Sequence, residues 1–128
     1  MATALIIDDN NMNLTSLSIL LSKEGIDPIA LSTPTLIEQA LEEVDDIVVM
    51  FLDLEFPRYN GLDLIASLKA MPALANVPII AYSVHISEVN ETRMAGFDGF
   101  IGKPLDVHQF PDQLRRILQG EAVWDVGQ

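Results

Sequence analysis

The feature that most constrains the fold of this chain is a regular alternation of short apolar runs with longer amphipathic stretches. Five of the runs are rich in branched and aromatic side chains, which is typical of β-strands. They are Ala4–Ile7, Pro28–Leu31, Ile47–Leu52, Val77–Tyr82 and Phe97–Ile101. Because these runs are apolar throughout instead of alternating with polar residues, both faces of the predicted sheet are expected to be covered.

An amphipathic stretch follows each of these strands. In the first stretch leucines recur at the spacing of one helix face, and the other stretches show similar patterns. The predicted helices span Asn11–Glu24, Thr35–Val44, Leu62–Met71, Ser87–Ala95 and Val107–Leu118. Residues typical of helix N-caps accompany three of them, namely Thr33, Ser87 and Asp106.

Strands that alternate with helices are joined by right-handed crossovers and form a mostly parallel sheet. The chain is therefore predicted to adopt a doubly wound (βα)5 α/β fold. Its 128 residues, of which 49% are hydrophobic, fit one domain with a packed core. The domain is predicted to span residues 1–120, and residues 121–128 are predicted to be a short tail. Trp124 in that tail is expected to pack back on the domain, with contact to a partner as the alternative.

The charge of the chain excludes several classes of function. A net charge of −12, from 19 acidic and 7 basic residues, argues against direct binding of nucleic acid. The absence of cysteine excludes disulfides, thiolate metal sites and cysteine nucleophiles. The N-terminus lacks the basic region of a signal peptide, and no apolar run approaches the roughly 20 residues of a membrane span. We therefore expect a cytoplasmic protein that does not insert into membranes.

Polar residues stand at the carboxyl ends of four of the predicted strands. Asp8 and Asp9 follow the first strand, Asp53 the third, Ser83 the fourth and Lys103 the fifth. Singly, each could be a helix cap, a turn residue or a solvated side chain. Open α/β sheets bind ligands at the carboxyl ends of their strands, so the convergence of these residues there predicts a functional site.

The charges of this predicted site require a cation. Three clustered carboxylates against the single positive charge of Lys103 leave a deficit of two, which a divalent ion would close. Ligands that are all oxygen favour a hard cation such as Mg²⁺. His85 and His108 are isolated and outside any metal-ligand spacing, so we expect them at the surface.

Four segments of the chain, taken together and in order, resemble those of response-regulator receiver domains of two-component signalling. They are "LIIDDN" at 5–10, "FLDLEFPRYNGLDLI" at 51–65, "PIIAYS" at 78–83 and "AGFDGFIGKPL" at 95–105. The resemblance covers roughly residues 3–118 and is to stand-alone, chemotaxis-regulator-like receivers. It implies a flavodoxin-like three-layer sandwich with a parallel five-stranded sheet in the order 2-1-3-4-5. Whether the chain is a stand-alone protein or part of a larger one is left open.

The resemblance also implies a role for the acidic residues. Asp53 corresponds to the phosphoacceptor, and Asp8 and Asp9 correspond to the acidic pair of the magnesium site. In receivers the Mg²⁺ is held by this pair, by the phosphoacceptor and by a main-chain carbonyl, which corresponds here to that of Glu55.

The remaining motif residues resemble the parts of a switch. Ser83 and Lys103 match the residues that assist phosphoryl transfer, and Ser83 also matches the switch hydroxyl. Phe100 matches the switch aromatic, whose ring is expected to enter from outside when the loop after the fourth strand moves inward. The alternative is that Phe100 is a permanently buried residue of the core. Lys103 precedes Pro104 through a peptide bond that is usually cis in the family.

The implied function is that of a phosphorylation-dependent signalling module, not an enzyme with a substrate of its own. Such a module accepts a phosphoryl group from a histidine kinase or a histidine phosphotransfer protein and assists its own dephosphorylation. The changed surface, formed by the fourth helix, fifth strand and fifth helix, then acts on a downstream protein target.

Four positions near Asp53 are expected to affect access to it or the shape of the loop beside it. Val84 stands where the family usually has a small residue, so it is predicted to narrow access to Asp53. Glu55 is expected to be a solvated rim residue, with tuning of hydrolysis as the alternative. Pro57 and Gly61 are expected to shape the loop after the strand.

The sequence is also compatible, to different degrees, with three functions other than that of a phosphorylated receiver. A receiver that acts as a scaffold without phosphorylation is the main alternative. An aspartate-nucleophile phosphatase of the haloacid-dehalogenase type would need Asp-x-Asp, whereas Glu55 occupies the second position here. A flavodoxin-like cofactor carrier would need a Gly-, Ser- and Thr-rich phosphate loop after the first strand, where this chain has "DDNN".

Overall fold

The computed structural model describes residues 2–56 and 59–125, so Pro57 lies outside the described residues. All five predicted strands are present, with their ends within two residues of the predicted ones, and a sixth strand follows them. The strands are β1 (Thr3–Ile7), β2 (Asp27–Leu31), β3 (Ile47–Asp53), β4 (Ile79–Ser83), β5 (Gly99–Gly102) and β6 (Val123–Asp125). They form one parallel sheet in the order β2-β1-β3-β4-β5-β6, which confirms the expected order and adds one strand at the edge.

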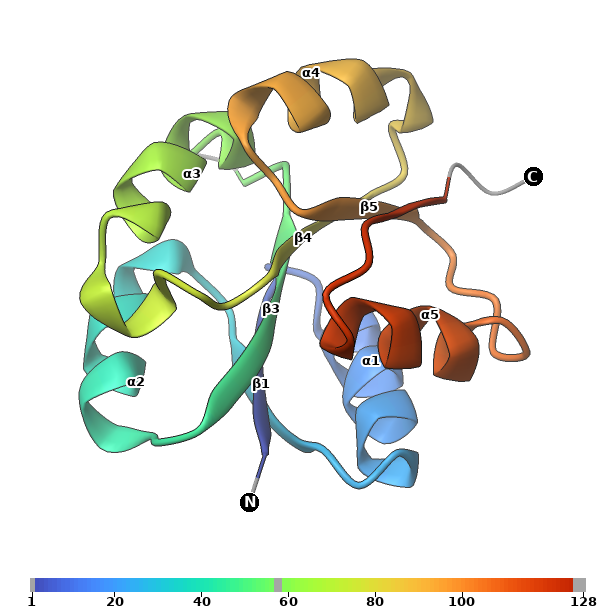
Figure 1. The fold of residues 1–128 in the computed structure, drawn as a ribbon, viewed down its shortest axis with the longest axis horizontal. Helices are drawn as coiled ribbons and strands as arrows, with labels where there is room; N and C mark the ends of the chain where they lie inside the picture. The colour runs from blue at the N-terminus through green and yellow to red at the C-terminus, as the bar shows by residue number, and fades with distance from the viewer. Residues whose placement is uncertain (1, 57–58, 126–128) are drawn as a thin grey trace.

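Helices cover both faces of this sheet, as predicted (Figure 1). They are α1 (Asn11–Lys23), α2 (Ile37–Glu43), α3 (Gly61–Lys69), α4 (Val89–Ala95) and α5 (Phe110–Leu118). The helices α1 and α5 lie on one face, and α2, α3 and α4 lie on the other. None of the helices in the described ranges has the length and hydropathy needed to cross a membrane.

Three helices begin later than the sequence predicts. The side chain of Asp106 caps a turn ahead of α5 and not the helix itself: it accepts from the backbone N–H groups of His108 at 2.8 Å and Gln109 at 3.3 Å, and Gln109 is the N-cap residue of α5. The helix then begins at Phe110. Similarly, 3₁₀ turns over Pro34–Leu36 and Ile86–Glu88 precede α2 and α4, so Ser87 lies in the turn and is not the N-cap of α4.

The core consists of two clusters, one on each face of the sheet. Successive residues of β3 alternate between them: Phe51 belongs to the cluster beneath α1 and α5, and Leu52 to the cluster beneath α2, α3 and α4. Both side chains are buried, as is Phe110 of α5, whose ring lies 6.0 Å from that of Phe51. Two covered faces therefore explain why β3 is apolar from Ile47 to Leu52.

The sixth strand lies in the segment that was predicted to be a tail. It runs parallel to β5, and Val123, Trp124 and Asp125 are the register partners of Gly99, Phe100 and Ile101. Trp124 packs back against the core, as expected. A run of three residues is too short to show the period of a strand, which is why the sequence pattern did not reveal it.

Candidate functional site

The residues predicted to form the site lie together at the carboxyl ends of the strands. Asp8 directly follows β1, Asp53 ends β3, Ser83 ends β4 and Lys103 directly follows β5. Because these four strands are adjacent and parallel, their carboxyl ends deliver the side chains to one place. A cleft of about 460 Å³ results, lined by Asp8, Asp9, Asn10, Asn13, Asp53, Glu55, Phe56, Ser83, Val84 and Lys103.

The ammonium group of Lys103 joins two of the carboxylates. Its Nζ lies 2.9 Å from Asp8 Oδ2 and 3.4 Å from Asp53 Oδ1. The three side chains are at most 9% exposed, so water screens these charges weakly. The same Nζ lies 4.4 Å from the ring centroid of Tyr82, so a buried aromatic face supports the cation as well.

Backbone N–H groups fix the orientation of both buried carboxylates. Asn10 donates to Asp8 Oδ1 at 2.9 Å, and Glu55 donates to Asp53 Oδ1 at 3.3 Å. Each donor lies two residues after the acceptor, which is the pattern of an Asx turn. The turns that leave β1 and β3 therefore hold the carboxylates toward Lys103.

The environment of Asp53 makes its charge costly. Burial raises the pKa of this carboxyl to about 6, an effect that the charge of Lys103 opposes and that of Asp8 increases. Near neutral pH the side chain is ionised, as a nucleophile or metal ligand must be. Its environment nevertheless favours the neutral form more than water does. A further cation would relieve this imbalance.

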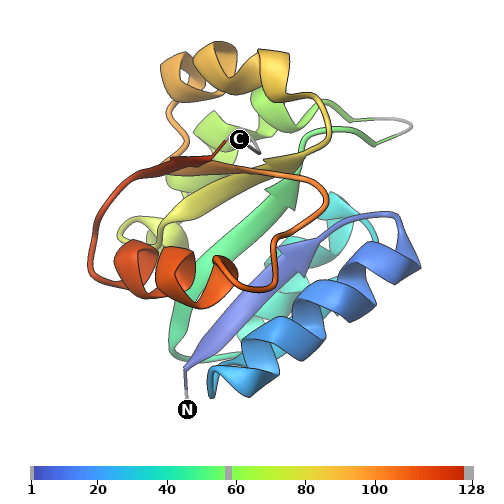
Figure 2. The same ribbon diagram turned by 90° about the vertical axis from the view of Figure 1, so that its right-hand side faces the viewer.

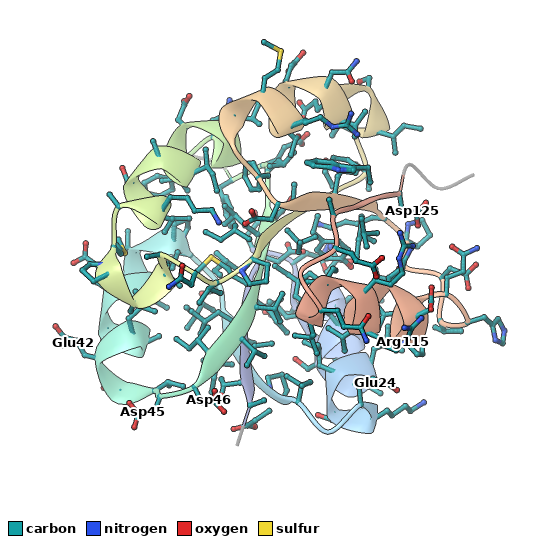
Figure 3. The ribbon with its side chains drawn as sticks, in the orientation of Figure 1. Glu24, Glu42, Asp45, Asp46, Arg115 and Asp125 are labelled. Carbon is teal, nitrogen blue, oxygen red and sulfur yellow. The ribbon has the colours of Figure 1, made fainter. Side chains whose placement is uncertain are left out.

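Three carboxylates are close enough to share a metal ion. Oxygen atoms of Asp8, Asp9 and Asp53 all lie within 4.8 Å of one another, with Asp9 exposed and the other two buried. Acidic residues also occur elsewhere: Glu42, Asp45 and Asp46 lie beside the start of β3 (Figure 3). Only the first group combines burial with a shared position at the carboxyl ends of the strands.

The two predicted switch residues lie in different places. Ser83 lines the cleft, and its Oγ accepts from the backbone N–H of His85 at 3.0 Å. Phe100 does not line the cleft: it is 0% exposed and belongs to the core cluster under α4, where its register partner is Trp124. Its ring is therefore already inside the protein, contrary to the expectation that it enters from outside.

One contact at the rim of the cleft was missed. His85 Nε2 lies 2.7 Å from Glu55 Oε1, with both side chains about half exposed. His85 does lie at the surface, as the sequence predicts, but it is not isolated. A signal was present, because Glu55 and His85 each stand two residues after a strand-end site residue, Asp53 and Ser83, and β3 and β4 are neighbours.

Comparison with known proteins defines the class to which this fold and site belong. Residues 4–115 match the family described as the response regulator receiver domain, so the chain belongs to this family. Its members are signalling modules of two-component systems, which interact with kinases or phosphotransfer partners.

Individual relatives support the assignment over nearly the whole length. The chain is 27% identical to the polar-differentiation response regulator DivK of Brucella ovis, with 94% of this chain and 98% of the relative covered. A response regulator receiver protein from Pseudomonas putida is 26% identical and has a TM-score of 0.76, covering 90% of this chain and 96% of that one. The fold is also that of chemotaxis protein CheY4 of Vibrio cholerae, with a TM-score of 0.81 at 18% identity over 91% of this chain and 98% of that chain.

Proposed function

We propose that the chain is a phosphorylation-dependent switch that accepts a phosphoryl group on Asp53. The donor would be a phosphohistidine on a histidine kinase or a histidine phosphotransfer protein. The observation that carries the proposal is the position of Lys103 Nζ, within 3.4 Å of Asp53 and 2.9 Å of Asp8 in a cleft open to a donor. A carboxylate that faces a fixed cation is suited to receive a group that brings further negative charge.

In the proposed transfer, a carboxylate oxygen of Asp53 forms a bond to phosphorus. The bond from phosphorus to the donor's imidazole nitrogen breaks, and the nitrogen keeps the electron pair and takes a proton from solvent. Lys103 stabilises the charge that gathers on the phosphoryl oxygens. Dephosphorylation reverses the modification: water attacks phosphorus, and the bond to Asp53 breaks to give phosphate and the carboxylate.

The donor set of the cleft fits Mg²⁺. Asp8, Asp9 and Asp53 would hold the ion together with the main-chain carbonyl of Glu55. The backbone at Glu55 is held by an antiparallel bridge to Asn60. The hydrogen bonds of this bridge come from flanking residues, among them the bond that Gly61 N–H donates to the carbonyl of Leu54 at 2.8 Å. When bound, Mg²⁺ supplies positive charge that offsets the carboxylates and stabilises the phosphoryl group.

Ser83 is placed to pass the modification on to the surface. Its Oγ is an acceptor in the bond from His85, so the hydroxyl hydrogen remains available for donation to a phosphoryl group on Asp53. The loop between β4 and α4 would follow Ser83 inward. Since the ring of Phe100 is already buried beneath this loop's helix, its contribution would be a change of packing that alters the α4–β5–α5 surface for a downstream protein target.

The net charge of −12 supports action through protein contacts, because phosphate backbones of nucleic acids would be repelled. Together with the family's role in signalling by kinases, this leads us to propose a cytoplasmic location.

The experiment is incubation with Mg²⁺ and a small acyl phosphate donor, followed by intact-mass measurement. Wild-type protein and the control Asp63→Asn, an exposed acid of α3, should each gain one phosphoryl group, whereas Asp53→Asn should gain none. Absence of an adduct on the wild type with every donor tried would contradict the proposal and support a scaffold receiver instead.

A further inference from the structure

The face between α4 and α5 is covered by the chain's own C-terminal strand. Figure 2 shows this segment passing between the two helices. Val123 is 4% exposed and joins the core under α5, while Trp124 packs toward α4, where the guanidinium of Arg93 lies 4.5 Å from the ring centroid. Alternate side chains of β6 thus bind both sides of the face.

The edge of β5 is shaped to receive a neighbouring strand. A Cβ atom on Gly99 would lie 2.7 Å from the carbonyl oxygen of Val123 and 3.0 Å from Ile80 Cδ1. The first of these contacts is with backbone, which cannot give way without moving the strand. A glycine at this position therefore permits the close approach of β6.

The docking of β6 nevertheless includes a defect. Gln113 of α5 is 5% exposed and donates from Nε2 to Asp125 Oδ2 at 2.6 Å. Its Oε1 is buried and has no hydrogen-bond partner, and it is the one such side-chain atom found in residues 2–56 and 59–125. Because a buried acceptor without a partner is unfavourable, and would be hydrated if β6 left, this defect weakens docking.

A direct line of paired residues connects β6 with the functional site. Asp53 is the register partner of Tyr82, Tyr82 of Ile101, and Ile101 of Asp125. Lys103, which contacts Asp53, stands two residues after Ile101 on the same chain segment. If the carboxyl ends of β4 and β5 shift, the position of β5, the strand to which β6 is bound, therefore changes as well.

We propose that β6 is a releasable cover of the α4–β5–α5 face. When β6 is released, the edge of β5 is exposed and a segment of a partner protein can add to it as a parallel strand. This segment has the same chemistry as β6: a branched apolar residue, then an aromatic residue, then an acidic residue. The trigger, phosphorylation of Asp53, rests on the proposed function. The docked strand competes with the partner, so the partner's apparent affinity depends on the fraction of chains with β6 released.

The first test follows Trp124, the only tryptophan of the chain, by fluorescence. The full chain is treated with Mg²⁺ and an acyl phosphate donor, and the adduct is quantified by mass in the same sample. Acrylamide quenching of Trp124 should rise by at least about twofold in proportion to the adduct, as expected for an equilibrium shifted by ligand. Asp53→Asn should not respond. A complete adduct with unchanged quenching would overturn the proposal.

The second test does not depend on phosphorylation. A labelled peptide with the sequence of residues 120–125 is added to full-length Trp124→Ala, whose own β6 lacks its aromatic anchor. The peptide should bind this variant at least about tenfold more tightly than the wild type or Met94→Ala, an exposed change on α4. Adding Gly99→Ala to Trp124→Ala should abolish binding.

The two tests separate the failures. If no adduct forms, the proposed function fails, and the peptide experiment alone then decides whether β6 can be replaced by another strand. A peptide that does not bind Trp124→Ala, or that binds equally well when Gly99→Ala is present, would show that β5 does not accept a strand and would overturn the proposal.

Discussion

At the scale of single residues, the site is a balance of charges in a poorly solvated place. Asp53 would be costly to bury alone, and Lys103 offsets its charge only in part because the same ammonium group also contacts Asp8. The pKa of Asp53 is therefore raised to about 6, first by burial. The ionised carboxylate therefore reduces the stability of the fold near neutral pH.

This balance predicts a pH-dependent effect of Asp53→Asn. Since the pKa of Asp53 in the folded chain is above its unfolded value of 3.8, the carboxyl stabilises the folded state below about pH 4, and this contribution is lost as the pH rises through about 6. The variant cannot ionise. In metal-free buffer it should exceed the wild type in stability by on the order of 1–2 kcal/mol at about pH 8, after allowance for solvent screening, and by about half as much at about pH 5.

Urea unfolding of both proteins at the two pH values measures this difference. Mg²⁺ should narrow the gap at the higher pH, because an ion bound only by the folded wild type stabilises it. A gap that is the same at both pH values would show that the ionisation of Asp53 does not destabilise the fold.

Val84 predicts a second effect, on rates instead of stability. Its side chain is 61% exposed and lines the cleft, so its methyl groups narrow the approach to Asp53. Val84→Ala should phosphorylate and dephosphorylate about two- to fivefold faster than the wild type, a change of less than about 1.4 kcal/mol in barrier. Ile86→Ala is the control, since Ile86 is an exposed residue of the same loop that does not line the cleft. Equal rates in Val84→Ala and the wild type would rule out a steric role.

At the scale of elements, the site depends on how the chain leaves each strand. After β3 the chain turns back within a few residues, and Gly61 N–H donates to the carbonyl of Leu54 at 2.8 Å at the start of α3. A Cβ atom on Gly61 would lie 2.7 Å from Leu54 Cα and 2.8 Å from the carbonyl oxygen of Asp53. The close packing of α3 against the end of β3 thus fixes the backbone that carries Asp53.

Gly61→Ala is therefore expected to damage both stability and phosphorylation. Overpacking against backbone should cost about 1–3 kcal/mol of unfolding free energy, and displacement of Asp53 should slow adduct formation. The control is Asn60→Ala, which removes the N-cap bond that Leu62 N–H donates to Asn60 Oδ1 and should cost about 1 kcal/mol without slowing phosphorylation. Urea unfolding and the mass assay measure the two effects. If Gly61→Ala phosphorylated as fast as Asn60→Ala, the helix start would not position Asp53.

At the scale of the whole molecule, charge opposes the compact state. The chain carries −12 in 128 residues, and its acidic groups lie at both ends of the sheet (Figure 3). Folding brings these groups closer together than they are in the unfolded chain. Mutual repulsion is therefore a general cost, separate from the local balance at Asp53.

This repulsion predicts that salt stabilises the fold without any divalent ion. Raising the NaCl concentration from about 0.01 M to about 0.1 M shortens the Debye length from about 30 Å to about 10 Å. The urea midpoint of the wild type should rise. Asp53→Asn should show nearly the same increase, because most of the repulsion lies outside the site. A midpoint that falls with added salt would indicate that attractive pairs dominate the charge interactions.

Most of this fold, and the grouping of the candidate site residues, follows from local patterns in the sequence. Periodic apolar runs specify strands and helices locally, and parallel strands necessarily bring their carboxyl ends together, so Asp8, Asp53, Ser83 and Lys103 could be grouped from order alone. Short-range patterns do not encode contacts between distant segments. The pairing of His85 with Glu55, the burial of Phe100 and the extension of the sheet by residues 123–125 are visible only in the folded chain. Each depends on what packing places nearby, and for β6 the deciding partners, Gly99 and Arg93, lie more than twenty residues earlier in the chain.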